Sequence, residues 1–297
     1  MRRPTNPSES AVRQRLSALT RSLPAAEKGD VAQLHEARVA TRRLREAVLL
    51  MDHGSRTRRL ERRLRRLTRA LGPVRELDVS LRILDEFGDT GDVAATALRT
   101  LTRAIRAERT ELHSTMRRKI DAVDVEKLRR RAMATAKKHC RAGDTKALAK
   151  ARLRIAMRGA QLQTAVDHAG GLYLADRLHD VRLAIKKLRY ALELHNQLTG
   201  RRGVADLRTL KNAQDLLGRM HDFEILILRI RRVQGSSDAP ALRVSAELDR
   251  LVRRLERECR QLHGQYNEMR KKLVAMCEKS AASVHAPGRM ARAGSAA

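Results

Sequence analysis

The sequence is poor in the residues that many binding and folding mechanisms require. It contains no Trp, two Phe and three Tyr among 297 residues, so the aromatic platforms on which proteins stack single-stranded nucleic acid are missing. Its three cysteines, Cys140, Cys259 and Cys277, are an odd set without a Cys-x-x-Cys pair. This argues against a disulfide framework or a zinc ribbon and fits a reducing compartment, so we expect a cytoplasmic protein.

Long apolar runs and acidic residues are also scarce. The longest strongly apolar run, FEILIL from Phe223, is far too short to cross a bilayer, and the basic N-terminus has no apolar segment behind it, so we expect no membrane insertion and no export signal. The 34 Asp and Glu residues face 64 Lys and Arg residues, which leaves a net charge of +30. Such an excess predicts a polyanionic partner. Because coding bias can also enrich arginine, the placement of the charges has to decide.

A repeated segment divides the chain into two halves. LHEARVATRRLREAVLL from Leu34 aligns without a gap with LHDVRLAIKKLRYALEL from Leu178, and eight of 17 positions are identical. A second pair follows, in which LGPVRELDV from Leu71 aligns with LGRMHDFEI from Leu217. The offsets of 144 and 146 residues are nearly equal, which indicates an internal duplication with the same order of elements in each half.

Apolar residues recur at intervals of three and four through almost the whole chain and predict an all-α fold. We expect helices near residues 9–23, 31–52, 55–71, 74–87, 92–120, 124–141, 145–169, 176–199, 204–217, 220–233 and 239–279, separated by breaks rich in Gly and Pro. Four helices in each half predict two antiparallel four-helix bundles related by a pseudo-two-fold, with extra connecting helices. The predicted domain spans residues 9–279, with a first repeat at about 31–120, connecting helices at 121–170 and a second repeat at about 176–279. The tails, residues 1–8 and 280–297, are expected to be disordered.

One face of each repeat helix carries four potential cations, opposite the apolar face. The first row is His35, Arg38, Arg42 and Arg45, and the second row is His179, Arg182, Lys186 and Arg189. Each row is about 15 Å long at 1.5 Å per residue and has no intervening acidic residue, although like charges at this spacing destabilise a helix slightly. Basic residues of the following helices, also aligned between the halves, extend the set: Arg62 and Arg65 with Arg208 and Lys211. A solvated helix face would explain one such row, but its duplication favours a track that binds a multivalent anion.

Catalytic and metal-binding interpretations find little support in the sequence. His35 begins a pattern like the zinc motif His-Glu-x-x-His, but Val39 occupies the place of the second histidine. Cys259 and His263 could form half of a metal site, and no second half is evident. Because no nucleophile with a base and no phosphate-binding loop is visible, we expect a binding protein without enzymatic activity, metal or cofactor. Four acidic residues are expected to pair with arginines rather than to act in catalysis: Glu76, Asp78, Asp222 and Glu224.

The repeated motifs, LHEARVATRRLREA and LHDVRLAIKKLRYALE with the LG-containing segment after each, resemble the CHAD domain, the conserved histidine α-helical domain. The resemblance covers nearly the whole chain and implies two four-helix bundles that bind inorganic polyphosphate along a basic central cavity. It further implies that the two rows supply the binding residues and that bacterial members associate with polyphosphate granules. The halves differ where His221 aligns with Arg75. Two alternatives stay open: non-specific binding of nucleic acid, duplex DNA above all, and, more remotely, phosphotransfer through a histidine.

Overall fold

The computed structural model describes residues 7–49, 54–89, 94–140, 144–200 and 204–285. In these residues the chain forms nine α-helices and no strand, which confirms the predicted all-α fold. The helices are α1 (Pro7–Glu27), α2 (Val31–Val48), α3 (Ser55–Gly88), α4 (Ala95–Asp121), α5 (Val125–Cys140), α6 (Asp144–Ala169), α7 (Ala175–Thr199), α8 (Val204–Gln234) and α9 (Leu242–His285). Within the described residues, no helix is both long and apolar enough to cross a membrane.

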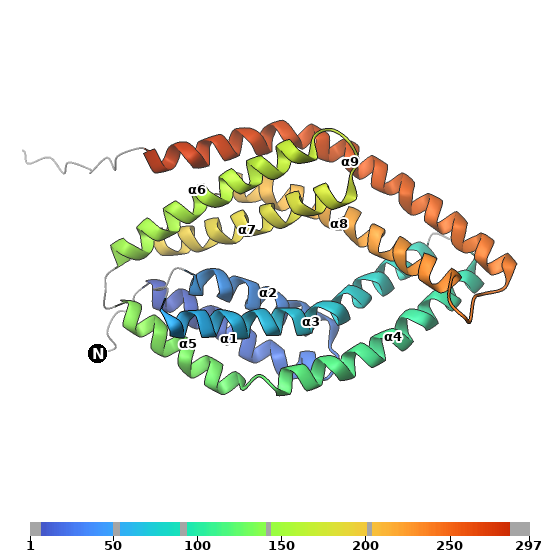
Figure 1. The fold of residues 1–297 in the computed structure, drawn as a ribbon, viewed down its shortest axis with the longest axis horizontal. Helices are drawn as coiled ribbons and strands as arrows, with labels where there is room; N and C mark the ends of the chain where they lie inside the picture. The colour runs from blue at the N-terminus through green and yellow to red at the C-terminus, as the bar shows by residue number, and fades with distance from the viewer. Residues whose placement is uncertain (1–6, 50–53, 90–93, 141–143, 201–203, 286–297) are drawn as a thin grey trace, which may run out of the picture.

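Two of the predicted helix breaks are wrong. α3 continues through Gly72 and Pro73, and α8 continues through Gly218. Pro73 has no N–H to donate and an interior proline costs a helix about 3 kcal/mol, but Leu71 and Val74 beside it are fully buried. Packing along this continuous apolar stripe therefore outweighs the cost, and α3 changes direction along its length (Figure 1).

The outermost helices extend further than the sequence predicts. α1 begins at Pro7 and α9 ends at His285, so both reach into the segments expected to be tails. The remaining tail residues, 1–6 and 286–297, lie outside the described residues.

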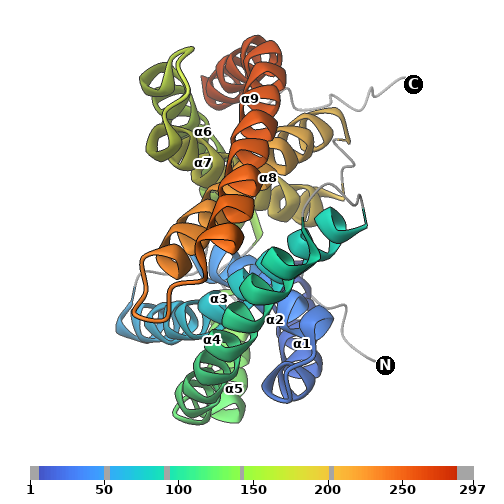
Figure 2. The same cartoon turned by 90° about the vertical axis from the view of Figure 1, so that its right-hand side faces the viewer.

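The helices form two groups that share α3 and α4 (Figures 1 and 2). One buried core combines α1, α2, α5, the first part of α3 and the last part of α4, with Ala151 of α6 and Leu194 of α7 at its edge. The other combines α6, α7, α8 and α9 with the last part of α3 and the first part of α4, from Leu77 to Ile105. The cores therefore do not follow the boundary between the sequence repeats, and the arrangement as two four-helix bundles with a pseudo-two-fold stays a prediction.

The two repeat helices, α2 and α7, contact each other between these groups. α2 begins after Asp30, whose carboxylate accepts a hydrogen bond from the Gln33 N–H at 2.9 Å and caps the helix. Leu34 and Leu44 of α2 and Leu188 of α7 are fully buried. Because the apolar face of each helix packs into a core, the polar faces of both helices are left near their mutual contact.

Candidate functional site

The middle parts of the two basic rows lie together where α2 meets α7. Arg38 and Arg42 of α2 are close enough to Lys186 of α7 for their positive charges to lower its pKa, and Arg42 acts in the same way on Arg182. These four residues, Arg38, Arg42, Arg182 and Lys186, are called the central cluster below. The sequence predicts one row on each helix, and the structure joins the two rows into one site.

The central cluster holds its positive charges at a cost in free energy. Burial, followed by repulsion from neighbouring arginines, lowers the pKa of Lys186 to about 6 and that of Arg38 to about 10. Asp222 offsets part of this repulsion, with its Oδ1 atom 3.8 Å from Arg182 Nη2. A nearby anion would therefore favour the protonated form of Lys186.

Four arginines of the rows have a buried Nε donor with no hydrogen-bond partner among the described residues. They are two pairs related by the sequence repeat, Arg38 with Arg182 and Arg45 with Arg189. Buried polar groups normally have partners, and guanidinium donors bind carboxylates and phosphates with particular strength. The same donor thus lacks a partner in both halves of the described chain, as it does in Arg15 and Arg229 outside the rows.

The repeated histidines flank this cluster in matching surroundings. His35 lies near Arg75, and His179 lies beside His221, the residue that aligns with Arg75. The two Nδ1 atoms of His179 and His221 are 3.3 Å apart. Burial lowers the pKa of both repeated histidines, and the second cause is Arg75 for His35 and His221 for His179.

The structure brings one of the four predicted second-helix residues to the rows. Burial and the charge of Arg65 lower the pKa of Arg45, so these two side chains are neighbours. Arg65 is also paired with Glu61 at 2.6 Å. The other three positions are exposed: Arg62, Arg208 and Lys211.

Three of the four acidic residues expected to pair with arginines do so, namely Glu76, Asp78 and Asp222. The Asp78 side chain is fully buried, and its pair joins α3 to α4. Glu224 accepts a hydrogen bond from the Tyr173 hydroxyl at 2.6 Å, and its charge raises the pKa of Arg182 without a direct ion pair to an arginine among the described residues. In the described part of the chain, no group of three or more His, Cys, Asp or Glu side chains is arranged to hold a metal ion.

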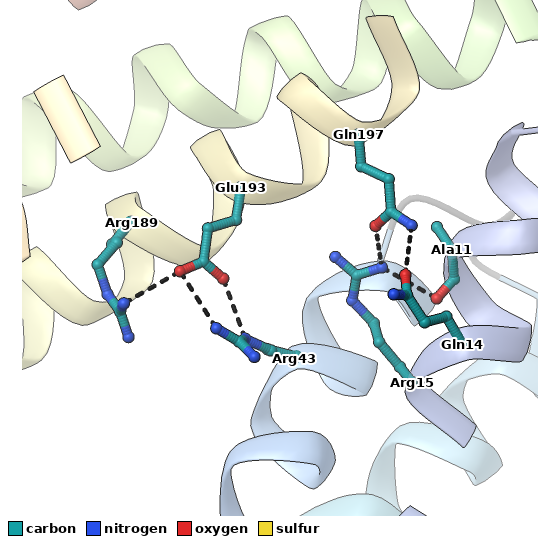
Figure 3. Close-up of polar contacts among 7 residues, drawn as sticks. All are labelled: Ala11, Gln14, Arg15, Arg43, Arg189, Glu193 and Gln197. Atoms are coloured by element: carbon teal, nitrogen blue, oxygen red, sulfur yellow. Dashed lines mark hydrogen bonds and ion pairs between the residues drawn. The ribbon is translucent and has the colours of Figure 1, made fainter. Parts of the chain in front are cut away.

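A second line of polar contacts joins the two groups of helices, and the sequence interpretation missed it (Figure 3). Arg43 Nε of α2 donates to Glu193 Oε2 of α7 at 3.0 Å, and Arg189 Nη1 lies 3.0 Å from Glu193 Oε1. Beside this pair, the buried Arg15 of α1 donates to Gln197 of α7. Glu193 follows Arg189 by four residues, a spacing that could have indicated this ion pair. No signal in one sequence connects it with Arg43.

These features define an all-α protein with a duplicated pair of basic helices. The CHAD domain family matches residues 10–231, and the chain belongs to this family. The crystal structure of the CHAD domain from the plant Ricinus communis has a TM-score of 0.62 and 20% identity, over 95% of this chain and 91% of that chain. PptA from Streptomyces chartreusis has a TM-score of 0.65 and 18% identity, over 89% of this chain and 97% of that chain. At such identities the likeness shows the fold alone. Among curated proteins, none matches this chain.

Proposed function

We propose that this protein binds inorganic polyphosphate along the central cluster and the two rows that extend from it. The observation that carries the proposal is the meeting of both rows around Lys186, where basic side chains are half-buried together. A polymer with a negative charge on every phosphate would compensate this repulsion and accept hydrogen bonds from the guanidinium groups of the rows. Members of the CHAD family are taken to bind this polymer, which agrees with the local chemistry.

We further propose that binding takes place without catalysis. Three of the four residues in the central cluster are arginines, which stay protonated and supply only donors, so the cluster offers mainly positive charge and hydrogen bonds. Aromatic side chains, on which bases would stack, make up 2% of the sequence, and this favours a polymer without bases over single-stranded nucleic acid.

The decisive measurement is a titration with long-chain polyphosphate and with duplex DNA, at equal phosphate concentration and about 0.15 M salt. We expect polyphosphate to bind more tightly per phosphate and to displace DNA from the protein. Tighter binding of DNA would replace the proposal with the nucleic-acid alternative.

A pair of double variants separates the site from the general charge of the protein. Arg38→Gln with Arg182→Gln removes two charges from the central cluster, whereas Arg62→Gln with Arg208→Gln removes two charges from exposed positions outside it. We expect the first variant to lose at least about tenfold in affinity, because charge-assisted hydrogen bonds contribute roughly 1.5–3 kcal/mol each, and the second to lose much less. Equal losses would mean that binding follows net charge alone.

The proposed location is the surface of polyphosphate granules in the cytoplasm. In a polymer-accumulating cell, a fluorescent fusion should form foci on the granules. These foci should disperse when the polymer-synthesising enzyme is removed. Foci that persist without polyphosphate would point to another partner.

A further inference from the structure

Glu193 is an acidic side chain placed among the cations of the second row. Its two carboxylate oxygens contact Arg43 of α2 and Arg189 of α7 (Figure 3). The exposed fraction of the side chain is 20% for Glu193, 16% for Arg189 and 40% for Arg43. The Glu193 carboxylate thus pairs with Arg189 of the second row and with Arg43 of α2. Both arginine side chains are partly exposed to solvent.

The first row has no carboxylate at the aligned position, because Glu193 aligns with Leu49 in the repeat. Arg45, the equivalent of Arg189, lies near Glu46 and Glu61 instead, and neither of these bridges the row to a cation of α7 among the ion pairs of the described residues. A purely structural role, tying α7 to the first group of helices, is partly filled by Arg15 and Gln197 next to it. The position of Glu193 at the end of a cationic row therefore needs a further explanation.

We propose that Glu193 is an internal competitor for the bound polyanion. Carboxylate and phosphate use the same guanidinium donors, so a phosphate chain that reaches Arg189 has to displace Glu193. Displacement also frees Arg43, which then becomes a further binding residue outside the two rows. The inference rests on the proposed binding of polyphosphate.

The first test removes the negative charge of Glu193 and keeps the shape of its side chain. Glu193→Gln should raise the affinity for long-chain polyphosphate about three- to tenfold at low salt, because one negative charge close to the polymer is removed. Glu126→Gln is the matched control, since Glu126 pairs with Arg129 on α5 and is exposed. The control should change affinity by less than about twofold, as expected of a screened charge at a distance.

The second test asks whether Arg43 is released. In the wild-type background Arg43→Gln should cost less than about threefold in affinity, because its charge is already paired. In the Glu193→Gln background the same change should cost several times more, because the freed guanidinium then contacts phosphate. This non-additivity measures the coupling between the two residues.

The outcomes separate this inference from the proposed function. Failure of the wild-type protein to bind polyphosphate would overturn both. Normal binding by the wild type, with Glu193→Gln equal to or weaker than Glu126→Gln, would overturn the competitor role alone. If Glu193→Gln does not fold, as judged by thermal denaturation, the test compares the loss of polyphosphate affinity in Arg43→Gln with the loss in Arg42→Gln. Arg42 has no ion pair among the described residues, so an equal loss from both changes would refute the proposal.

Discussion

Replacing Lys186 by methionine should stabilise the protein without an anion and weaken its binding of polyphosphate. Lys186 lies in the central cluster, where burial and the charges of Arg182, Arg42 and Arg38 lower the pKa of its amine from 10.5 to about 6. Methionine has a similar length and no charge. The change therefore removes the cost of holding an amine among these cations and keeps most of the packing.

The magnitude follows from the two pKa values of Lys186. Between pH 6 and pH 10.5 the unfolded chain binds one more proton than the folded protein, so the free energy of unfolding increases with pH. At pH 7.5 the ordinary pKa of lysine lies about three units above the pH. At about 1.4 kcal/mol per pKa unit, the gain in the free energy of unfolding on replacing Lys186 is at most about 4 kcal/mol. The flexible side chain can reach water and screening is strong, so we expect a gain of about 1–2 kcal/mol.

Thermal denaturation at several pH values tests this reasoning. At pH 7.5 the Tm of Lys186→Met should exceed that of the wild type by about 2–4 °C, and the difference should shrink as the pH approaches 10. Lys187→Met, at the adjacent exposed position, is the control and should leave Tm unchanged. A loss of stability in Lys186→Met, or a gain that does not depend on pH, would show that packing and not charge repulsion governs this position.

Three further predictions concern the affinity for polyphosphate. Affinity should increase as the pH falls from about 8 to 6, because bound phosphate raises the pKa values of Lys186, His35 and His179, which burial and neighbouring cations lower in the free protein. Calorimetry in buffers of different ionisation enthalpy should detect proton uptake on binding, and no proton uptake would contradict the assignment. Arg38→Gln and Arg182→Gln, as single changes, should cause similar losses in a binding titration, because the two arginines share one cluster; a loss confined to one of them would mean that the halves bind separately. The slope of log affinity against log salt should be about −5 to −6 for roughly eight engaged phosphates, whereas a flat response would exclude binding by counterion release.

Periodicity and duplication predict much of the fold. Intervals of three and four between apolar residues predict helices because a helical face repeats in that way, and the repeated motif places a basic row on α2 and on α7. The same reasoning fails at Gly72 and Pro73, where local propensity predicts a break and burial of the surrounding residues keeps α3 continuous. Local preference is overridden there by packing that a single sequence does not reveal.

The meeting of the two rows lies beyond what the sequence can predict. A helical period assigns Arg42 and Lys186 to faces of their own helices, but it does not say that these faces lie together. For the same reason alignment places Arg62 and Arg208 at equivalent positions of the two halves but does not say how far they lie from the rows; both are exposed. Arg43 was omitted because it lies beside the first row, and its partner Glu193 is 150 residues away.

The two halves, although duplicated, offer unequal surfaces to a polyanion. The first half has Arg75 beside its histidine and Leu49 at the end of its row, whereas the second has His221 and Glu193 in the aligned positions. The second half also contains Lys186, whose pKa is about 6, where the first has an arginine. The three arginines of the first row are therefore permanently charged and only His35 there varies with pH, while in the second row both His179 and Lys186 vary with pH and Arg189 is paired with a carboxylate. A bound chain should be held by the first row at alkaline pH, and contact with the second row should strengthen as the pH falls, because protonation there adds charge next to phosphate.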